Sequence, residues 1–230
     1  MDPSTLIPTP DQVPIGWDRF QYLLTLSLLW IAWCTLHSLL ITNTVNTWCR
    51  KKGGLCNGLY RMGYIIFSIL TLLPLLYYQY SLPQQLLFSW QGYWRLPQLC
   101  LLLYALVMFW KGKRNYDMDF FLGLRQWRDY RQKKPSSPTP FHCSGILQYI
   151  RHPWYSGGIA FLWALGPITD AGLLSKSILT AYLIIGTLLE ERKLRRELGP
   201  VYASYCRQVP MLFPWKGKVP VQKIMEEKDQ

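Results

Sequence analysis

The sequence predicts an all-α fold: a polytopic membrane helical bundle of about five transmembrane helices, with the N-terminus outside and the C-terminus cytoplasmic. Hydrophobic residues make up 50% of the 230 residues and are gathered in long segments. Residues 20–41 and 62–80 contain no Asp, Glu, Lys or Arg, and about 20 such residues span a bilayer. Basic residues, 25 against 13 acidic ones, lie mostly between the apolar segments. We treat residues 1–230 as a single membrane domain.

The apolar segments predict spans near 20–41, 60–80, 96–110, 154–169 and 174–189. The last three are shorter than a full span, but beside two long spans we expect them to be membrane helices whose cytoplasmic ends lie inside protein. Residues 170–176 (DAGLLSK) leave room for only a tight turn, so the last two helices should form an antiparallel hairpin. Residues 1–18 are acidic and proline-rich, which predicts a short non-helical tail rather than a signal peptide.

The charges predict the orientation, because Lys and Arg are retained on the cytoplasmic side of short loops. With the N-terminus outside, 22 basic residues face the cytoplasm and three, Arg19, Arg95 and Lys176, face outward. The net charge of +12 then reflects membrane topology, which argues against a nucleic-acid partner. We therefore expect a multi-pass membrane protein whose basic helix ends, and any active site among them, face the cytoplasm.

The largest polar stretch lies in the middle of the chain. Residues 111–132 mix apolar and basic side chains, which predicts an amphipathic helix at the membrane surface. Residues 133–145 (KKPSSPTPFHCSG) are rich in proline and serine and predict a loop. The six cysteines form no C-x-x-C pair, so we expect no disulfide, no metal site and no chemical role for them.

Two short motifs carry most of the candidate chemistry. In Arg151–Gly157 (RHPWYSG), Pro153 suits a helix start and Arg151 suits the cytoplasmic boundary, but neither role explains His152 and Tyr155. Free N–H groups at a helix start attract a carboxylate. Glu190–Glu191 ends the fifth apolar segment, where acids oppose the helix dipole.

The two motifs should meet, because a hairpin with a short turn brings the start of one helix beside the end of the next. Glu191 has a helical partner in Arg195, four residues on, whereas Glu190 has none and is the better candidate for a ligand carboxylate. Donors at one helix end and carboxylates at the other suit a zwitterion such as an amino acid. His37, a polar residue inside the first span, is a further functional candidate, or else a hydrogen-bond partner of a neighbouring helix.

RHPWYSG, the following apolar stretch, the Glu pair and the tail LGPVYASYCRQVPMLFPW resemble the integral-membrane methyltransferases related to isoprenylcysteine carboxyl methyltransferase and the phospholipid methyltransferases. Their shared pattern is R-H-P-x-Y-x-G followed by E-E. The segments LHSLL, FLGLRQW, TAYLIIG with EERKL, and VPMLFP most closely resemble the bacterial thiol methyltransferases of the methanethiol S-methyltransferase type and their NnrU-like relatives, which implies a bacterial cytoplasmic membrane.

The resemblance implies an S-adenosylmethionine-dependent enzyme whose cofactor region spans residues 139–215. The cofactor-binding residues that it implies are His142, Arg151, His152, Pro153, Trp154, Tyr155, Gly157, Glu190 and Glu191. The isoprenylcysteine enzymes place an arginine about one turn before the acidic pair, where this chain has Gly186 and Thr187. A carboxylate acceptor would lose its partner there, whereas a small thiol such as methanethiol or hydrogen sulfide needs none.

The thiolate is the nucleophile, and because a thiol has a pKa near 8.5, a modest base or a nearby cation suffices to form it; His37 and Arg125 are our candidates. A lipid-soluble acceptor could enter from the surrounding membrane lipids, and nothing in the sequence points to an obligate protein partner. Two alternatives stay open: a methyltransferase acting on an isoprenylcysteine carboxylate or a lipid amine, and an NnrU-like haem-binding isomerase with His37 as an iron ligand.

Overall fold

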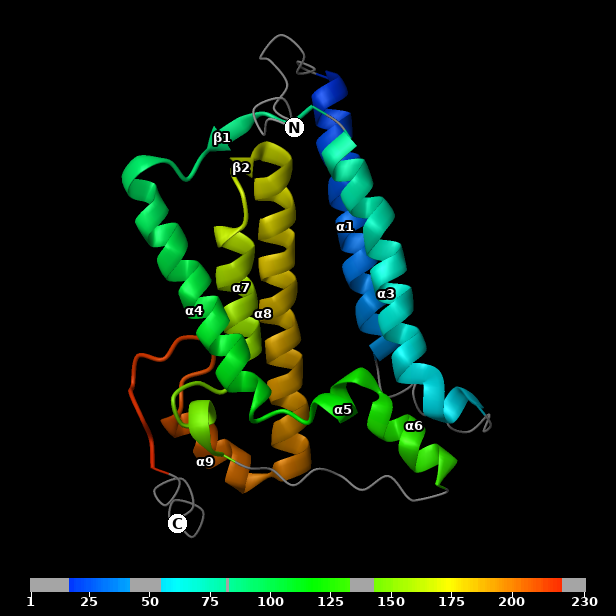
Figure 1. Ribbon diagram of the computed structural model, residues 1–230, viewed down its shortest axis with the longest axis vertical. Coiled ribbons are helices and arrows are strands. Elements are labelled where there is room, and N and C mark those ends of the chain that lie inside the picture. Colours follow the sequence, from blue (N-terminus) through cyan, green and yellow to red (C-terminus); the bar gives the residue numbers. More distant parts are fainter. Residues whose placement is uncertain (1–16, 42–54, 82, 133–142, 221–230) are drawn as a thin grey trace. The chain divides into compact units, whose positions relative to one another are not determined.

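The computed structural model describes residues 17–41, 55–81, 83–132 and 143–220, and this part of the chain is mainly helical (Figure 1). The predicted tail over 1–16 and most of the predicted loop, 133–142, lie outside the described residues. The helices are α1 (Trp17–Ile41), α3 (Leu55–Ser81), α4 (Arg95–Lys113), α5 (Met118–Leu122), α6 (Leu124–Arg131), α7 (Pro153–Ala164), α8 (Asp170–Leu198) and α9 (Pro200–Gln208). Two 3₁₀ turns, η3 (Gly92–Trp94) and η4 (Gly145–Gln148), and two short strands, β1 (Leu86–Phe88) and β2 (Ile168–Thr169), complete them.

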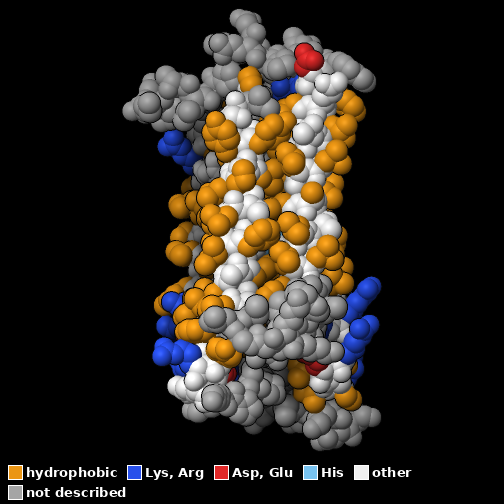
Figure 2. All heavy atoms as spheres, turned by 90° about the vertical axis from the view of Figure 1, so that its right-hand side faces the viewer, with side chains coloured by type: hydrophobic (Ala, Val, Ile, Leu, Met, Phe, Trp, Pro, Cys, Tyr) orange, Lys and Arg blue, Asp and Glu red, His pale blue; other side chains and the backbone are white. Residues whose placement is uncertain are grey.

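The predicted all-α membrane fold is confirmed. Within the described part of the chain, four helical stretches are long and apolar enough to cross a membrane: Asp18–Ile41, Leu59–Ser81, Gly92–Lys113 and Asp170–Leu198. Figure 2 shows one face on which hydrophobic side chains cover the helices over most of their length. The predicted span at 154–169 is a helix of only 12 residues, α7, which is shorter than a bilayer crossing.

The predicted end of this helix and the predicted turn after it are wrong. Helix α7 stops at Ala164, because Gly166 adopts a left-handed φ of 58° and Pro167 follows it. Residues 170–176 are not a turn but the first two turns of α8. The hydroxyl of Thr169 accepts a hydrogen bond from the Gly172 N–H (2.9 Å), which caps the start of that helix.

The described residues divide into two compact units, and α8 runs from the first into the second. In the first unit α1 and α3 pack around Leu26, Trp30 and Leu75. Polar contacts join the two helices: the indole N–H of Trp30 donates to the Gln79 side chain at 2.9 Å, and that of Trp33 to the Thr71 hydroxyl at 3.2 Å. Such bonds between helices satisfy polar groups that lipid tails cannot.

Two further sets of contacts hold segments of the first unit together. At one end β1 and β2 pair antiparallel, with Leu86 opposite Thr169 and Phe88 opposite Ile168. Elsewhere in the unit the predicted amphipathic helix is broken into α5 and α6 at Gly123, whose φ is 84°. The Arg61 side chain of α3 donates to the Phe121 carbonyl at 2.7 Å and so holds the break against α3.

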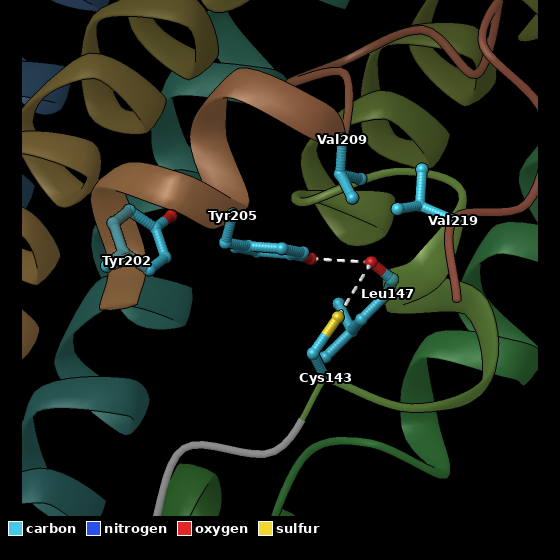
Figure 3. Close-up of a cluster of buried hydrophobic side chains, with 6 residues drawn as sticks. All are labelled: Cys143, Leu147, Tyr202, Tyr205, Val209 and Val219. Carbon is cyan, nitrogen blue, oxygen red and sulfur yellow. Dashed lines mark hydrogen bonds between the residues drawn. The ribbon is translucent and has the colours of Figure 1, made fainter. Parts of the chain in front are cut away.

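The second unit contains η3, α4, η4, α7, the second part of α8, and α9. Helices α4 and α7 approach closely, since a Cβ on Gly157 would lie 2.9 Å from the Met108 Cβ. A second core joins α9 to η4 and the residues around it (Figure 3). There the Leu147 carbonyl accepts hydrogen bonds from the Tyr205 hydroxyl (2.6 Å) and the Cys143 thiol (3.6 Å). This core fixes the chain just before α7, where the candidate site begins.

Candidate functional site

The two sequence motifs meet in the second unit, at the start of α7 and near the end of α8. The helices run antiparallel: the Trp163 indole N–H donates to the Thr180 hydroxyl at 3.1 Å, and near the other end His152 reaches Glu191 at 2.7 Å. Pro153 occupies the first turn of α7, where its missing N–H leaves no hydrogen bond unmade. The predicted convergence of His152, Tyr155, Glu190 and Glu191 is therefore present in the structure.

Glu191 is the central acceptor of the site. One oxygen, Oε1, accepts from the Arg151 Nε (2.8 Å), the His152 Nε2 (2.7 Å) and the Tyr202 hydroxyl (2.8 Å). The other, Oε2, accepts from the Arg151 Nη2 (3.0 Å) and the Cys206 thiol (3.2 Å), with Arg195 at 3.8 Å. A carboxylate offers about four lone pairs. Glu191 is thus fully occupied by the protein itself.

Arg151 is equally occupied. Its guanidinium grips Glu191 with two nitrogens, and its third nitrogen, Nη1, donates to the carbonyls of Cys206 (2.8 Å) and Val209. Only 8% of the Arg151 side chain and 6% of the Glu191 side chain are exposed. A buried bidentate pair with most of its remaining donors satisfied fixes geometry. Arg151 and Glu191 therefore hold α7, α8 and α9 together, and four of the five guanidinium N–H groups and both carboxylate oxygens already bind protein atoms.

Glu190 lies differently. Its side chain is 38% exposed, and the nearer ring nitrogen of His152, Nδ1, lies 4.0 Å from one carboxylate oxygen. The hydroxyls of Tyr155 and Tyr116 are its other neighbours. Burial, and then the nearby Glu190 charge, raise the pKa of Tyr116 above its ordinary range, so that this hydroxyl stays protonated and remains a donor.

Aromatic rings surround this carboxylate. The ring of Tyr155 meets that of His152 edge-on at 5.7 Å, and the Trp154 indole lies 5.0 Å from the Tyr116 ring. Trp154 sits so close to α4 that a Cβ on Gly112 would come within 2.4 Å of the indole. Gly186, one turn before Glu190, faces the Tyr155 ring, and a Cβ there would lie 3.5 Å from it.

The remaining predicted site residues lie elsewhere. His142 is outside the described residues. His37 and Arg125 belong to the first unit. The His37 ring stacks on Trp33, and its two nitrogens meet the Tyr64 hydroxyl (2.6 Å) and the Ser68 hydroxyl (3.2 Å). Arg125 is half-buried in α6.

The sequence analysis missed three residues of the site: Tyr116, Tyr202 and Cys206. The sequence did not point to Cys206, whose thiol donates to Glu191 at 3.2 Å and so has a structural role. Tyr202 and Cys206 lie four residues apart on α9, a spacing that puts both on one helix face. That spacing was the available signal, and Tyr205, also buried, lies on the same face.

The family model described as NnrU protein matches residues 25–208, which include both motifs and α9. The chain belongs to the NnrU family. No solved structure gives a significant match to this NnrU-family chain.

Curated relatives of this NnrU-family chain carry one name. Methanethiol S-methyltransferase of Crocosphaera subtropica is 40% identical over 44% of this chain and 39% of its own length. Methanethiol S-methyltransferase 1 of Bradyrhizobium diazoefficiens is 28% identical over 84% of this chain and 67% of its own length. Methanethiol S-methyltransferase of Mycobacterium tuberculosis is 31% identical over 67% of this chain and 64% of its own length. The chain thus spans between about two fifths and two thirds of these relatives.

Proposed function

We propose that this NnrU-family chain transfers a methyl group from S-adenosylmethionine to a small thiol, of the methanethiol or hydrogen sulfide type. The proposal rests on the different surroundings of the two adjacent glutamates. It also rests on the similarity of the chain to proteins named methanethiol S-methyltransferase. Glu191 is buried under five hydrogen bonds, while Glu190 remains half-exposed among aromatic rings. We place the reaction at the cytoplasmic face of a bacterial membrane, since the basic loops predict that side.

The donor set fits S-adenosylmethionine. Glu190 would accept from the ammonium group, and the Tyr155 hydroxyl and His152 lie beside it. The positive end of the α7 dipole would favour the carboxylate. The rings of Trp154, Tyr155 and Tyr116 offer electron-rich faces to a sulfonium cation. When bound, the cofactor supplies a methyl group on a positively charged sulfur, which a thiolate can attack.

The protein's tasks are to orient the reactants, exclude water and remove a proton. The thiol would lose its proton, and its sulfur would bond to the methyl group as the sulfonium–methyl bond breaks, leaving a neutral thioether on the cofactor. A thiol pKa near 8.5 means that a modest base, or a nearby cation that stabilises the thiolate, suffices. His37, hydrogen-bonded to Tyr64, stays our candidate for the base, and Arg125 our candidate for the cation.

We expect a small acceptor, because Gly186 has no side chain that could bind a larger acceptor with a charged group. This position lies on the same helix face as Glu190 and against the Tyr155 ring. It carries no cation that would pair with a carboxylate or a phosphate. A neutral thiol needs none.

The test is an acceptor panel with the purified full-length protein and methyl-labelled S-adenosylmethionine. We expect labelled thioether from methanethiol or hydrogen sulfide, at a rate that rises as the pH approaches the thiol pKa, and little product from a prenylcysteine or from phosphatidylethanolamine. Efficient methylation of the prenylcysteine with inert small thiols would overturn the thiol assignment. A Soret band in the purified protein would instead favour the haem-binding isomerase.

A further inference from the structure

Residues 212–218 (LFPWKGK) form a loop that presents aromatic and basic side chains together. Phe213 and Trp215 are each 66% exposed. Lys216 and Lys218 are also exposed, and residues 199–220 contain no Asp or Glu. Two neighbouring large aromatic side chains in water are unfavourable, and such a patch, rimmed by charge, marks an interaction surface. We call residues 212–218 the aromatic–basic loop.

The aromatic–basic loop is held at both ends, so its exposure is not fraying of a chain end. Before it, the carbonyls of Pro210 and Met211 accept hydrogen bonds from the backbone N–H groups of Arg151 (2.9 Å) and His152 (3.1 Å). After it, the Val219 N–H donates to the Gln148 carbonyl at 3.0 Å. Val209 and Val219, on either side of the loop, are both buried in the core drawn in Figure 3. The ammonium of Lys216 caps the Arg207 carbonyl at 2.9 Å.

The anchors of the loop pack against the basic end of α4, one of the helices able to cross a membrane. Helix α4 contacts η4. Just beyond α4 the Asn115 side chain donates to the Ser144 carbonyl at 2.8 Å. The last turns of α4 carry Trp110, 57% exposed, with the Arg114 guanidinium 4.6 Å from its ring centre. Exposed Trp with Lys and Arg at the end of an apolar helix is the pattern of a membrane–water interface.

We propose that the aromatic–basic loop inserts Phe213 and Trp215 into the bilayer interface, where Lys216 and Lys218 contact the phosphates of anionic phospholipids. The aromatic rings supply the apolar area, and the absence of acidic residues makes the loop complementary to a negatively charged leaflet. The proposal does not depend on the chemistry at Glu190. It does link the lipid to the site, because the same backbone that leads into the loop holds Arg151 and His152.

Photocrosslinking tests this directly. The full-length protein would carry benzoylphenylalanine at position 213 or 215, in vesicles of phosphatidylethanolamine and phosphatidylglycerol, and adducts would be identified by intact-protein mass spectrometry. We expect phospholipid adducts at both positions, as at Leu103, an exposed position in α4 that serves as the positive control. Position 197, where Glu197 is 53% exposed near the end of α8, should give none.

Absence of lipid adducts at both 213 and 215, with adducts at 103, would overturn the proposal. So would adducts only to another protein when the same variants are irradiated in native membranes. A second readout is the thermal unfolding midpoint, which phosphatidylglycerol should raise above its value in phosphatidylethanolamine alone. The rise should be lost in the double variant Lys216→Gln, Lys218→Gln and kept in Tyr93→Ser, an exposed aromatic outside the loop. An unchanged rise in the lysine variant would contradict the phosphate contacts.

Discussion

Glu190 and Glu191 are neighbours in sequence but serve different structures, because successive residues of a helix point about 100° apart. Glu191 faces α7 and α9 and binds Arg151, His152, Tyr202 and Cys206. Glu190 faces Tyr155 and Tyr116. Glu191 therefore contributes to the stability of the site, whereas Glu190 is the residue we propose for ligand binding, and matched substitutions should separate the two roles.

Glu191→Gln should destabilise the protein strongly while Glu190→Gln should not. Removing the Glu191 charge leaves the buried Arg151 guanidinium without its counter-charge, which costs about 3–5 kcal/mol. Glu190 is half-exposed and is not part of a buried ion pair with Arg151, so its substitution leaves no buried guanidinium without a counter-charge. Thermal unfolding in detergent measures both variants against the wild type, and equal midpoints for the two would contradict the division of roles.

Glu190→Gln should instead weaken S-adenosylmethionine binding. Losing one charged hydrogen bond to the ammonium group costs about 1.5–3 kcal/mol. Calorimetric titration of the folded variant gives the value, with Glu197→Gln, on the exposed last turns of α8, as the control. Wild-type affinity in Glu190→Gln would remove this residue from the proposed binding site.

Cys206 predicts a pH dependence of stability. Burial, and then the hydrogen bond to Glu191, raise the pKa of this thiol from 9.0 to about 11. Below pH 9 the thiol is protonated in both the folded and the unfolded chain. Between pH 9 and 11 the unfolded chain releases the proton first, so the stability conferred by the protonated thiol is lost as the pH rises through this window.

The unfolding midpoint of the wild type should therefore fall more steeply from pH 9 to 11 than that of Cys206→Ala. The exposed Cys100 provides the matched control, since Cys100→Ala should keep the wild-type slope. Identical slopes in all three proteins would show that the Cys206 proton is not linked to folding.

At the scale of the helix, α7 depends on two adjacent glycines in opposite ways. Gly157→Ala places a methyl group 2.9 Å from the Met108 Cβ and 3.3 Å from the Ala105 carbonyl, so α4 must move, at a cost of about 1–3 kcal/mol. Gly158→Ala meets only the flexible end of Leu183 at 3.6 Å, and should be neutral or stabilising by up to about 1 kcal/mol. The thermal unfolding midpoint of Gly157→Ala should fall below that of the wild type, whereas the midpoint of Gly158→Ala should rise or stay the same. A destabilised Gly158→Ala with an unaffected Gly157→Ala would contradict the packing of α4 on α7.

The helices of the chain were predictable where apolar residues form long uninterrupted runs, as in α1 and α3. The boundaries between α7 and α8 were not. Asp170 and Gly172 have the composition of a turn, but the Thr169 hydroxyl caps Gly172 and lets the helix begin there, while Gly166 and Pro167 make the actual turn. Local capping chemistry decided the boundary, and composition does not reveal it.

The site was predictable to the extent that it follows from the hairpin. His152 and Glu191 lie at opposite ends of two consecutive helices, and any antiparallel pair brings them together. Tyr116 and Tyr202 come from segments before and after the hairpin, which reach Glu190 and Glu191 only through tertiary packing. Hydrophobic periodicity does not encode such contacts, and α9, with nine residues, is too short for a clear period.

At the scale of the whole molecule, the distribution of charge predicts how the chain lies in the membrane. Of the 25 basic residues, 22 fall on one side if the chain crosses five times with the N-terminus outside, the short helix α7 being the fourth crossing. The opposite orientation would translocate those 22 residues, against the retention of Lys and Arg in the cytoplasm. The predicted outer side is not without charge, but there Arg19 is paired with Asp170.

Accessibility to a membrane-impermeant thiol reagent should therefore differ between the two ends of the helices. In a background without native cysteines, Gln84→Cys and Gly172→Cys should react in intact cells, since both lie beside the β1–β2 end, whereas Lys113→Cys and Lys218→Cys should react only after the membrane is opened. We expect this difference in labelling because 22 basic residues on one side outweigh the three on the other, and the basic side is retained in the cytoplasm. Labelling of Lys113→Cys and Lys218→Cys in intact cells would place the RHPWYSG and Glu190–Glu191 motifs on the outer face. The proposed function would then fail, because S-adenosylmethionine from the cytosol is charged and could not reach an outward-facing Glu190 without a transporter.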